Sequence, residues 1–151
     1  MGLDMFLHLK CYESKFKKEK DDGNFYPDEL SKIYSKVKNH LGFAFKETKY
    51  AVGYWRNAHA IHDWFVKHCA YGKDDCKEID ITKAQLMELR RTCKRVLNDR
   101  DSASDLLPDD YLMYNEYYYQ LLEYTVELIT DVLYVIQKTG TKYDVAYRAS
   151  W

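Results

Sequence analysis

The residue types most able to do chemistry gather in one short segment of the chain. Trp55, Arg56, His59, His62 and Asp63 lie within nine consecutive positions. An indole face can stack on a flat ring, the planar guanidinium of arginine matches phosphate or carboxylate, and an imidazole donates a hydrogen bond. This combination is typical of a site that binds an anionic, nucleotide-like ligand.

The same residue types also fit a purely structural role, and the sequence leaves both interpretations open. In the structural interpretation the tryptophan is in the core, the arginine is on the surface and a buried histidine is bonded to a carbonyl. In the binding interpretation an aspartate near the N-terminus and a tyrosine-rich segment form the opposite wall. The ligand-binding residues that we select are Trp55, Arg56, His59, His62, Asp4 and Tyr118.

The histidines and the aspartate of this segment do not favour a metal site. On a helix His62 projects roughly 60° from His59 and about 100° from Asp63, so the three side chains converge poorly on one ion. The four cysteines form no C-x-x-C pair, and the glycines form no phosphate-binding loop. We therefore expect no metal, no cofactor and no catalytic residue, although a small enzyme stays the third hypothesis.

Charge and hydropathy narrow the range of partners. The net charge is −1, whereas a domain that binds duplex nucleic acid usually has a basic excess. No apolar run approaches the 18 residues of a membrane span, and the N-terminus does not have the pattern of a signal peptide. We expect a cytoplasmic protein with reduced thiols that binds neither nucleic acid nor membrane.

The chain of 151 residues predicts a single domain over residues 1–151, because its length and its 46% apolar content suffice for one core. Its most unusual feature is the presence of 15 tyrosines. A tyrosine has an apolar ring and a polar tip, which suits interfaces and ligand walls. Tyrosine could equally replace leucine and phenylalanine in a small core.

Hydrophobic periodicity predicts the elements of the first half. Residues 2–11 alternate as a half-buried strand, and a polar loop follows through Asn24. Pro27 opens a helix that Gly42 closes, and residues 43–52 form a second strand. Residues 54–69 have apolar positions at helical spacing around more than half the circumference, which predicts the central helix.

The second half is more helical. Residues 82–85 (Thr-Lys-Ala-Gln) fit a capping box at the start of a third helix, which ends near Leu97. A loop covers residues 98–110, and a long helix runs from about Asn115 to Lys138, stopped by Gly140. Alternation from Tyr143 to Arg148 predicts a last strand. The predicted class is α+β, with about four helices packed on a small sheet that uses the N- and C-terminal strands.

Two motifs give the chain a family resemblance. Its opening reads M-G-L-D-M-F-L, and residues 52–65 read V-G-Y-W-R-N-A-H-A-I-H-D-W-F. The chain resembles a family of small, functionally uncharacterised proteins of phages, prophages and bacteria, with an MGLDM(Y/F)L opening and a core close to V-G-Y-W-R-K-A-N-x-I-H-x-W-F. It departs from that pattern at Asn57 and His59, which replace lysine and asparagine. The resemblance implies an accessory or anti-defence factor and no established activity.

Two functions from different classes follow. The first is a non-catalytic, phage-type protein that binds and sequesters an anionic, nucleotide-like host immune signal. The alternative is a protein–protein inhibitor of a host defence enzyme that uses exposed tyrosines as anchors. The expected partners are therefore an anionic small molecule or a host protein, and a homo-oligomer is possible.

Overall fold

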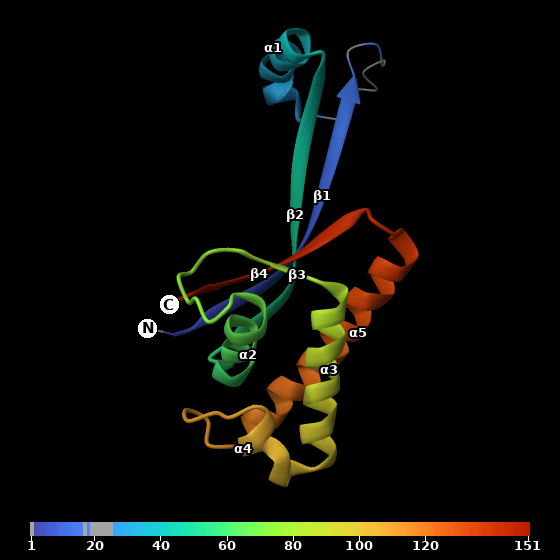
Figure 1. Cartoon of the computed structure of the whole chain (residues 1–151). Helices are drawn as coiled ribbons and strands as arrows, with labels where there is room; N and C mark the ends of the chain where they lie inside the picture. The colour runs from blue at the N-terminus through green and yellow to red at the C-terminus, as the bar shows by residue number, and fades with distance from the viewer. Residues whose placement is uncertain (1, 17, 19–25) are drawn as a thin grey trace. The chain divides into compact units, whose positions relative to one another are not determined.

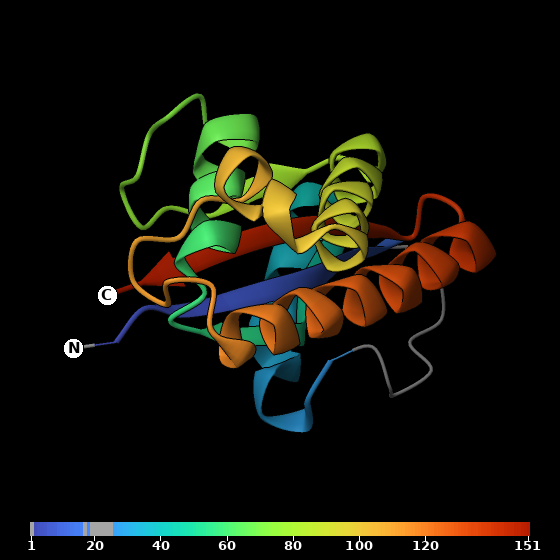
Figure 2. The same cartoon turned by 90° about the horizontal axis from the view of Figure 1, so that it is seen from below.

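The computed structural model describes residues 2–16, 18 and 26–151, and these form an α+β fold (Figures 1 and 2). The fold class predicted from the sequence is confirmed. Four strands form one sheet in the order β2-β1-β4-β3, with the strands nearest to the two termini paired at its centre. The strands are β1 (Asp4–Phe16), β2 (Phe43–Arg56), β3 (Ile79–Ile81) and β4 (Tyr143–Ser150).

Five α-helices accompany the sheet in the described part of the chain, where about four were expected. They are α1 (Ser31–Leu41), α2 (His59–Cys69), α3 (Lys83–Asn98), α4 (Ala103–Leu106) and α5 (Glu116–Thr139). Short 3-10 helices span Asp28–Leu30 and Arg100–Ser102. The one-turn helix α4 and the second 3-10 helix lie where a plain loop was predicted.

The chain divides into two compact units. One comprises the residues up to Leu9 and from Tyr50 onward, and the other comprises Lys10–Lys49. Both β1 and β2 contribute residues to each unit. The expectation of a single domain over residues 1–151 stays a prediction.

The core of the larger unit lies between the sheet and helices α2, α3 and α5. The alternation predicted for the first strand is present, because the odd-numbered residues from Leu3 to Leu9 are buried. They pack in one cluster with Phe65 of α2, Leu89 of α3 and Ile129 of α5. The antiparallel register of β3 with β4 places Ile81 opposite Val145 in the same core.

Several helix boundaries match the sequence signals. Thr82 accepts a hydrogen bond from the backbone of Gln85, and the Gln85 side chain accepts one from the backbone of Thr82, which completes the predicted capping box. Helix α1 is followed by Gly42 in the left-handed αL conformation, with a φ of 81°. Gly140, which follows α5, also has a positive φ, of 65°, but its ψ of −122° lies outside the αL region.

Two predicted boundaries are wrong. The first strand extends to Phe16, so residues 12–16 are strand and not loop. The rest of the predicted loop lies outside the described residues, except for residue 18. The central helix begins at His59 and not at Tyr54, because β2 continues to Arg56. Asn57 then has a φ of 55°, which breaks the strand before the helix begins. The short strand β3 was not foreseen.

Candidate functional site

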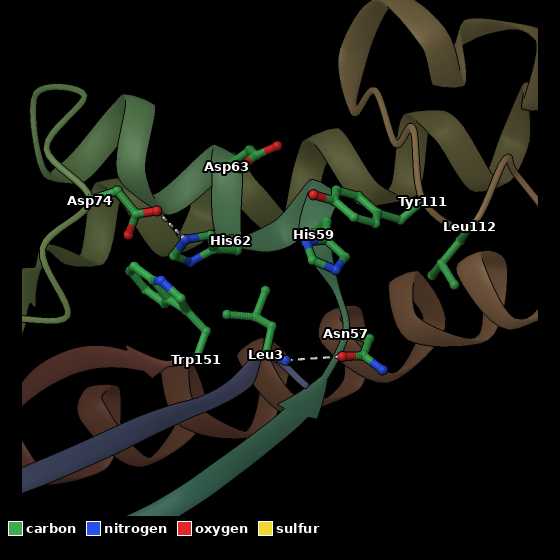
Figure 3. Close-up of a pocket in the computed structure, with 9 residues that line it drawn as sticks. All are labelled: Leu3, Asn57, His59, His62, Asp63, Asp74, Tyr111, Leu112 and Trp151. Atoms are coloured by element: carbon green, nitrogen blue, oxygen red, sulfur yellow. Dashed lines mark hydrogen bonds and ion pairs between the residues drawn. The ribbon is translucent and has the colours of Figure 1, made fainter. Parts of the chain in front are cut away.

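A pocket of about 640 Å³ opens in the larger unit beside the start of α2 (Figure 3). Its walls come from six separate segments: the residue before β1, the turn before α2, α2 itself, two loops, and the C-terminal residue. The lining residues are Leu3, Asn57, His59, His62, Asp63, Asp74, Tyr111, Leu112 and Trp151. Three of these, the two histidines and Asp63, belong to the segment that sequence analysis singled out.

The turn at Asn57 fixes one side of the pocket. Asparagine tolerates the left-handed backbone conformation better than most residues, since its short polar side chain can bond locally. Here the Oδ1 of Asn57 accepts a hydrogen bond of 3.0 Å from the backbone of Leu3, and the backbone of Asn57 donates one of 2.8 Å to the Leu3 carbonyl. The start of β1 is therefore clamped to the turn that leads into α2.

His59 and Tyr111 form a flat double wall. Their rings are stacked, with centroids 3.7 Å apart and planes inclined by 14°. The loop that carries Tyr111 is held by the buried carboxylate of Asp109, which accepts hydrogen bonds from the backbones of Tyr111 and Leu112 at 2.9 and 2.7 Å. Its other oxygen accepts one of 3.3 Å from the backbone of Ala60, in the first turn of α2. Asp109 thus replaces the side-chain cap that Ala58 cannot supply.

His62 occupies the other end of the pocket and is only 5% exposed. Its Nδ1 is 2.7 Å from the hydroxyl oxygen of Tyr147, and its Nε2 is 3.1 Å from Oδ2 of Asp74. The contact with Asp74 has the distance of an ion pair but not the angles of a hydrogen bond, so Nε2 makes no hydrogen bond within the described part of the chain. Trp151 meets the imidazole edge-on, with ring centroids 5.5 Å apart.

The phenol of Tyr147 lies beside His62 and is protonated. Burial is the main reason that the pKa of Tyr147 is raised, and the carboxylates of Asp74 and Asp63 raise it further. The hydroxyl group therefore keeps its proton at neutral pH, within hydrogen-bond distance of Nδ1 of His62. The other ring nitrogen, Nε2, is buried beside Asp74.

The lining includes two carboxyl groups and two imidazoles, and none of the described lining residues is lysine or arginine. Although Asp63 is exposed as a residue, loss of hydration raises the pKa of its carboxyl, and the imidazoles of His62 and His59 oppose that shift. The pocket therefore offers acceptors for N–H groups more readily than cations for a phosphate.

The other selected residues lie elsewhere. Trp55 and Tyr118 are buried in the core, where the indole donates a 2.9 Å hydrogen bond to Thr125 and the phenol donates one of 2.8 Å to the Leu107 carbonyl. Neither lines the pocket, so their placement matches the structural interpretation. For Trp55 the reason is the strand: β2 turns alternate residues to opposite faces, and Trp55 faces the core while its neighbours face outward.

Asp4 and Arg56 meet in an exposed cluster with Tyr54. The phenol of Tyr54 donates a short hydrogen bond to Asp4, which is the main reason that its pKa is raised, while the nearby guanidinium of Arg56 lowers it. Arg56 also borders the pocket wall. A Cβ on Gly2 would lie 3.3 Å from Nε of Arg56 and 3.2 Å from Oδ1 of Asn57.

Sequence reasoning did not select Asp74 or Trp151 for the site, and from the tyrosine-rich segment it selected Tyr118, whereas Tyr111 of that segment lines the pocket. Asp74, Tyr111 and Trp151 each lie in a loop or at the chain end, outside any periodic pattern, and reach the pocket only through the tertiary fold. A weak signal existed for two of them. Asp74 and Tyr111 follow Gly72 and Pro108 closely, and residues of such turns often carry binding groups because they lie on exposed loops.

Nothing in the described residues forms a metal centre, since no group of three or more histidine, cysteine or acidic side chains could hold an ion. Two of the four cysteines also lack the character of nucleophiles. Burial raises the pKa of Cys69 and of Cys93 to about 12, so both remain protonated at neutral pH. None of the helices within the described ranges is long and apolar enough to cross a bilayer.

No family model, curated protein or solved structure matches the chain. The functional interpretation therefore rests on the geometry of the pocket.

Proposed function

We propose that the pocket binds a small nucleotide-like molecule by its ring, without catalysis. The observation that carries this proposal is the pairing of flat walls with carboxylates: His59 stacks on Tyr111 at one end, and Asp74 lies beside His62 and Trp151 at the other (Figure 3). A volume of about 640 Å³ is in the range of pockets that hold small organic ligands.

The lining favours a ring that carries amino groups. Aromatic faces stack on any base, which gives affinity with little selectivity. Selectivity then comes from the carboxylates of Asp63 and Asp74, because an exocyclic amine donates to a carboxylate, whereas a carbonyl at the same place meets a like charge. Guanine, adenine and cytosine have such an amine, and uracil does not.

The anionic part of such a ligand would stay outside the ring pocket. The described lining residues include no lysine or arginine, so a phosphate finds no strong partner there. Arg56 is the cation that supports this part of the proposal, because its guanidinium lies next to Asn57 at the rim. Arg56 already lies close to Tyr54 and to the carboxylate of Asp4 that Tyr54 bonds, and these contacts limit how strongly Arg56 binds an anion.

The resemblance to small phage proteins gives this proposal a setting. A phage-type accessory protein in the cytoplasm of its host could sequester a nucleotide-like immune signal in such a pocket, and so act as an anti-defence factor without chemistry. The thiols of Cys69 and Cys93 are protonated at neutral pH, and the pocket lining contains no cysteine, so binding explains the described groups better than turnover does.

Titration calorimetry with GMP, AMP, CMP and UMP tests the proposal. We expect heat of binding with one or more of the first three and weaker binding of UMP. Trp151 is half exposed while Trp55 and Trp64 are buried, so bound ligand should also protect the fluorescence of the chain from acrylamide quenching.

A matched pair of variants locates the site. Tyr111→Ala should weaken binding at least tenfold, because it removes half of the stacked wall, whereas Tyr134→Ala removes an exposed tyrosine from a helix outside the pocket and should change nothing. Equal affinity in both variants, or no heat with any of the four nucleotides, would refute the proposal.

A further inference from the structure

Helix α1 leaves its apolar side uncovered. None of its residues is buried, although Ile33, Val37 and Leu41 fall within about 80° of its circumference. Ile33 is 60% exposed and Leu41 is 51% exposed. A surface helix normally packs such an apolar stripe against a hydrophobic core, and the stripe of α1 is instead exposed.

The small unit around α1 cannot cover this stripe from its own core. In the unit formed by Lys10–Lys49, one buried cluster joins Tyr26 and Ala44, with Tyr34 of α1 stacked on Tyr26 at 3.8 Å. The unit also exposes Phe16 and Phe45. A segment of this size rarely builds a sufficient core alone, and association is one of the usual remedies.

The charged residues of α1 are all basic. Between Ser31 and Leu41 the helix carries Lys32, Lys36 and Lys38 with His40, and it has no acidic residue. Lys32 and Lys36 form no ion pair with any described residue. The helix is therefore an apolar stripe bordered by cations, which favours a partner with the opposite charge around an apolar surface.

Helix α5 presents such a surface in the other unit. Its exposed side carries Glu123, Glu127 and Asp131, and these three form no ion pair within the described ranges. Between them lie the exposed rings of Tyr117, Tyr124 and Tyr134, of which Tyr134 is 60% exposed. These six side chains fall within about one third of the circumference of the helix. Lys138 falls in the same third, with its ammonium 5.5 Å from the centroid of the Tyr134 ring, so the face carries three acidic groups and one basic group.

We propose that the chain forms a dimer in which α1 of each copy docks on the acidic tyrosine face of α5 of the other copy. Ile33 and Leu41 would pack on the tyrosine rings, while Lys32 and Lys36 pair with Glu123, Glu127 or Asp131. A twofold axis makes both contacts at once, so each copy contributes a basic and an acidic helix to a closed assembly. Tyrosine is enriched at interfaces, since one end of its ring is apolar and the other is wet.

Charge makes a second copy a better occupant than a lipid surface or a nucleic acid. The small unit has ten lysines and seven acidic residues, while the whole chain is at −1, so the larger unit is the acidic one. The complementary charge for α1 is thus present on the chain itself. Contact between the apolar stripe of α1 and the tyrosines of α5 also buries apolar surface, which contact with a polyanion would not do.

Reciprocal charge reversal tests the dimer. Sedimentation equilibrium of the parent chain should give a mass near twice the 18.1 kDa of one chain, falling toward the monomer as salt is added. The variant Lys32→Glu/Lys36→Glu should be monomeric, and so should Glu123→Lys/Glu127→Lys. Mixing the two variants should restore a dimer, because each basic helix then meets an acidic one in the other chain.

The control is Lys67→Glu/Lys73→Glu, which makes the same change in net charge on other exposed segments and should remain dimeric. Circular dichroism should show that all variants are folded. A parent chain that is monomeric at every concentration would overturn the proposal, and so would a dimer that both reversals leave intact. Binding of the monomeric parent to phosphatidylglycerol vesicles would assign α1 to a lipid surface instead.

Discussion

The Nδ1 of His62 and the hydroxyl of Tyr147 lie 2.7 Å apart, and this contact joins helix α2 to strand β4 inside the core. Both side chains are buried, so each polar atom depends on the other for a partner. The contact also fixes the position of the imidazole at the end of the pocket. It is therefore a structural contact that also shapes the binding site.

Tyr147→Phe should lower the free energy of unfolding by about 1–3 kcal/mol, because it leaves a buried imidazole nitrogen without a partner. Urea unfolding followed by circular dichroism measures this. Tyr134→Phe is the matched control and should change stability by less than about 0.5 kcal/mol, since that hydroxyl is on an exposed ring. Equal stability of the two variants would show that the bond to His62 does not contribute.

Gly53→Ala should also destabilise the fold. Gly53 lies on β2 with its Cα facing α5, and an added Cβ would come within 2.3 Å of a methyl carbon of Leu128. Leu128 is buried, so it has little room to move aside, and overpacking of this kind costs about 1–3 kcal/mol. Thermal unfolding should show a lower midpoint for Gly53→Ala. If the clash is the cause, Gly53→Ala should cost less in a Leu128→Ala background than in the parent chain.

Most of the fold could be predicted from the sequence, because periodicity and capping signals are local. Residues 54–58 are the instructive exception. Tyr54 and Ala58 continue the helical stripe of Ile61 and Phe65 by coincidence, which extended the predicted helix by five residues. The strand alternation of the same segment was the weaker pattern, and the pairing of β2 with β1 is a long-range interaction that decided the outcome.

The candidate site was predicted only in part for the same reason. His59 and His62 belong to one helix, so their proximity follows from spacing alone. Asp74, Tyr111 and Trp151 reach them through loops and a chain end, whose positions depend on contacts such as that of Asp109 with the start of α2. No short-range pattern predicts contacts of that kind.

Stability should fall in alkaline solution. Burial raises the pKa of Cys93 to about 12 from its ordinary value of 9.0, and it also raises the pKa of Tyr118 and of Tyr147. Above about pH 9 the unfolded chain loses protons that the folded chain retains, so the free energy of unfolding decreases as the pH rises. Each such group contributes a slope of about 1.4 kcal/mol per pH unit between its two pKa values.

Urea unfolding between pH 8 and pH 11, about the range in which these groups ionise in the unfolded chain, should show this decline. The variant Cys93→Ala should have a shallower profile, because one of the titrating groups is removed. Its cavity lowers stability by the same amount at every pH, so the slope is the informative quantity. A parent and a variant with identical slopes would mean that Cys93 does not titrate as its burial implies.

Arg56 and Trp55 are neighbours on β2 with opposite environments, and substitutions there should have opposite effects. Trp55 is buried and donates a hydrogen bond to Thr125, so Trp55→Ala should cost about 3–5 kcal/mol of stability. Arg56 is exposed, so Arg56→Ala should leave the urea midpoint nearly unchanged.

If Arg56 contacts the phosphate of a bound nucleotide, Arg56→Ala should weaken the affinity for the nucleotide by roughly tenfold or more, since a hydrogen bond to a charged group contributes about 1.5–3 kcal/mol. It should leave the affinity for the corresponding nucleoside, which lacks the phosphate, as it was. Calorimetry with GMP and guanosine on the parent and on Arg56→Ala separates the two contributions, and equal losses for both ligands would remove Arg56 from the phosphate site while leaving the ring pocket in place.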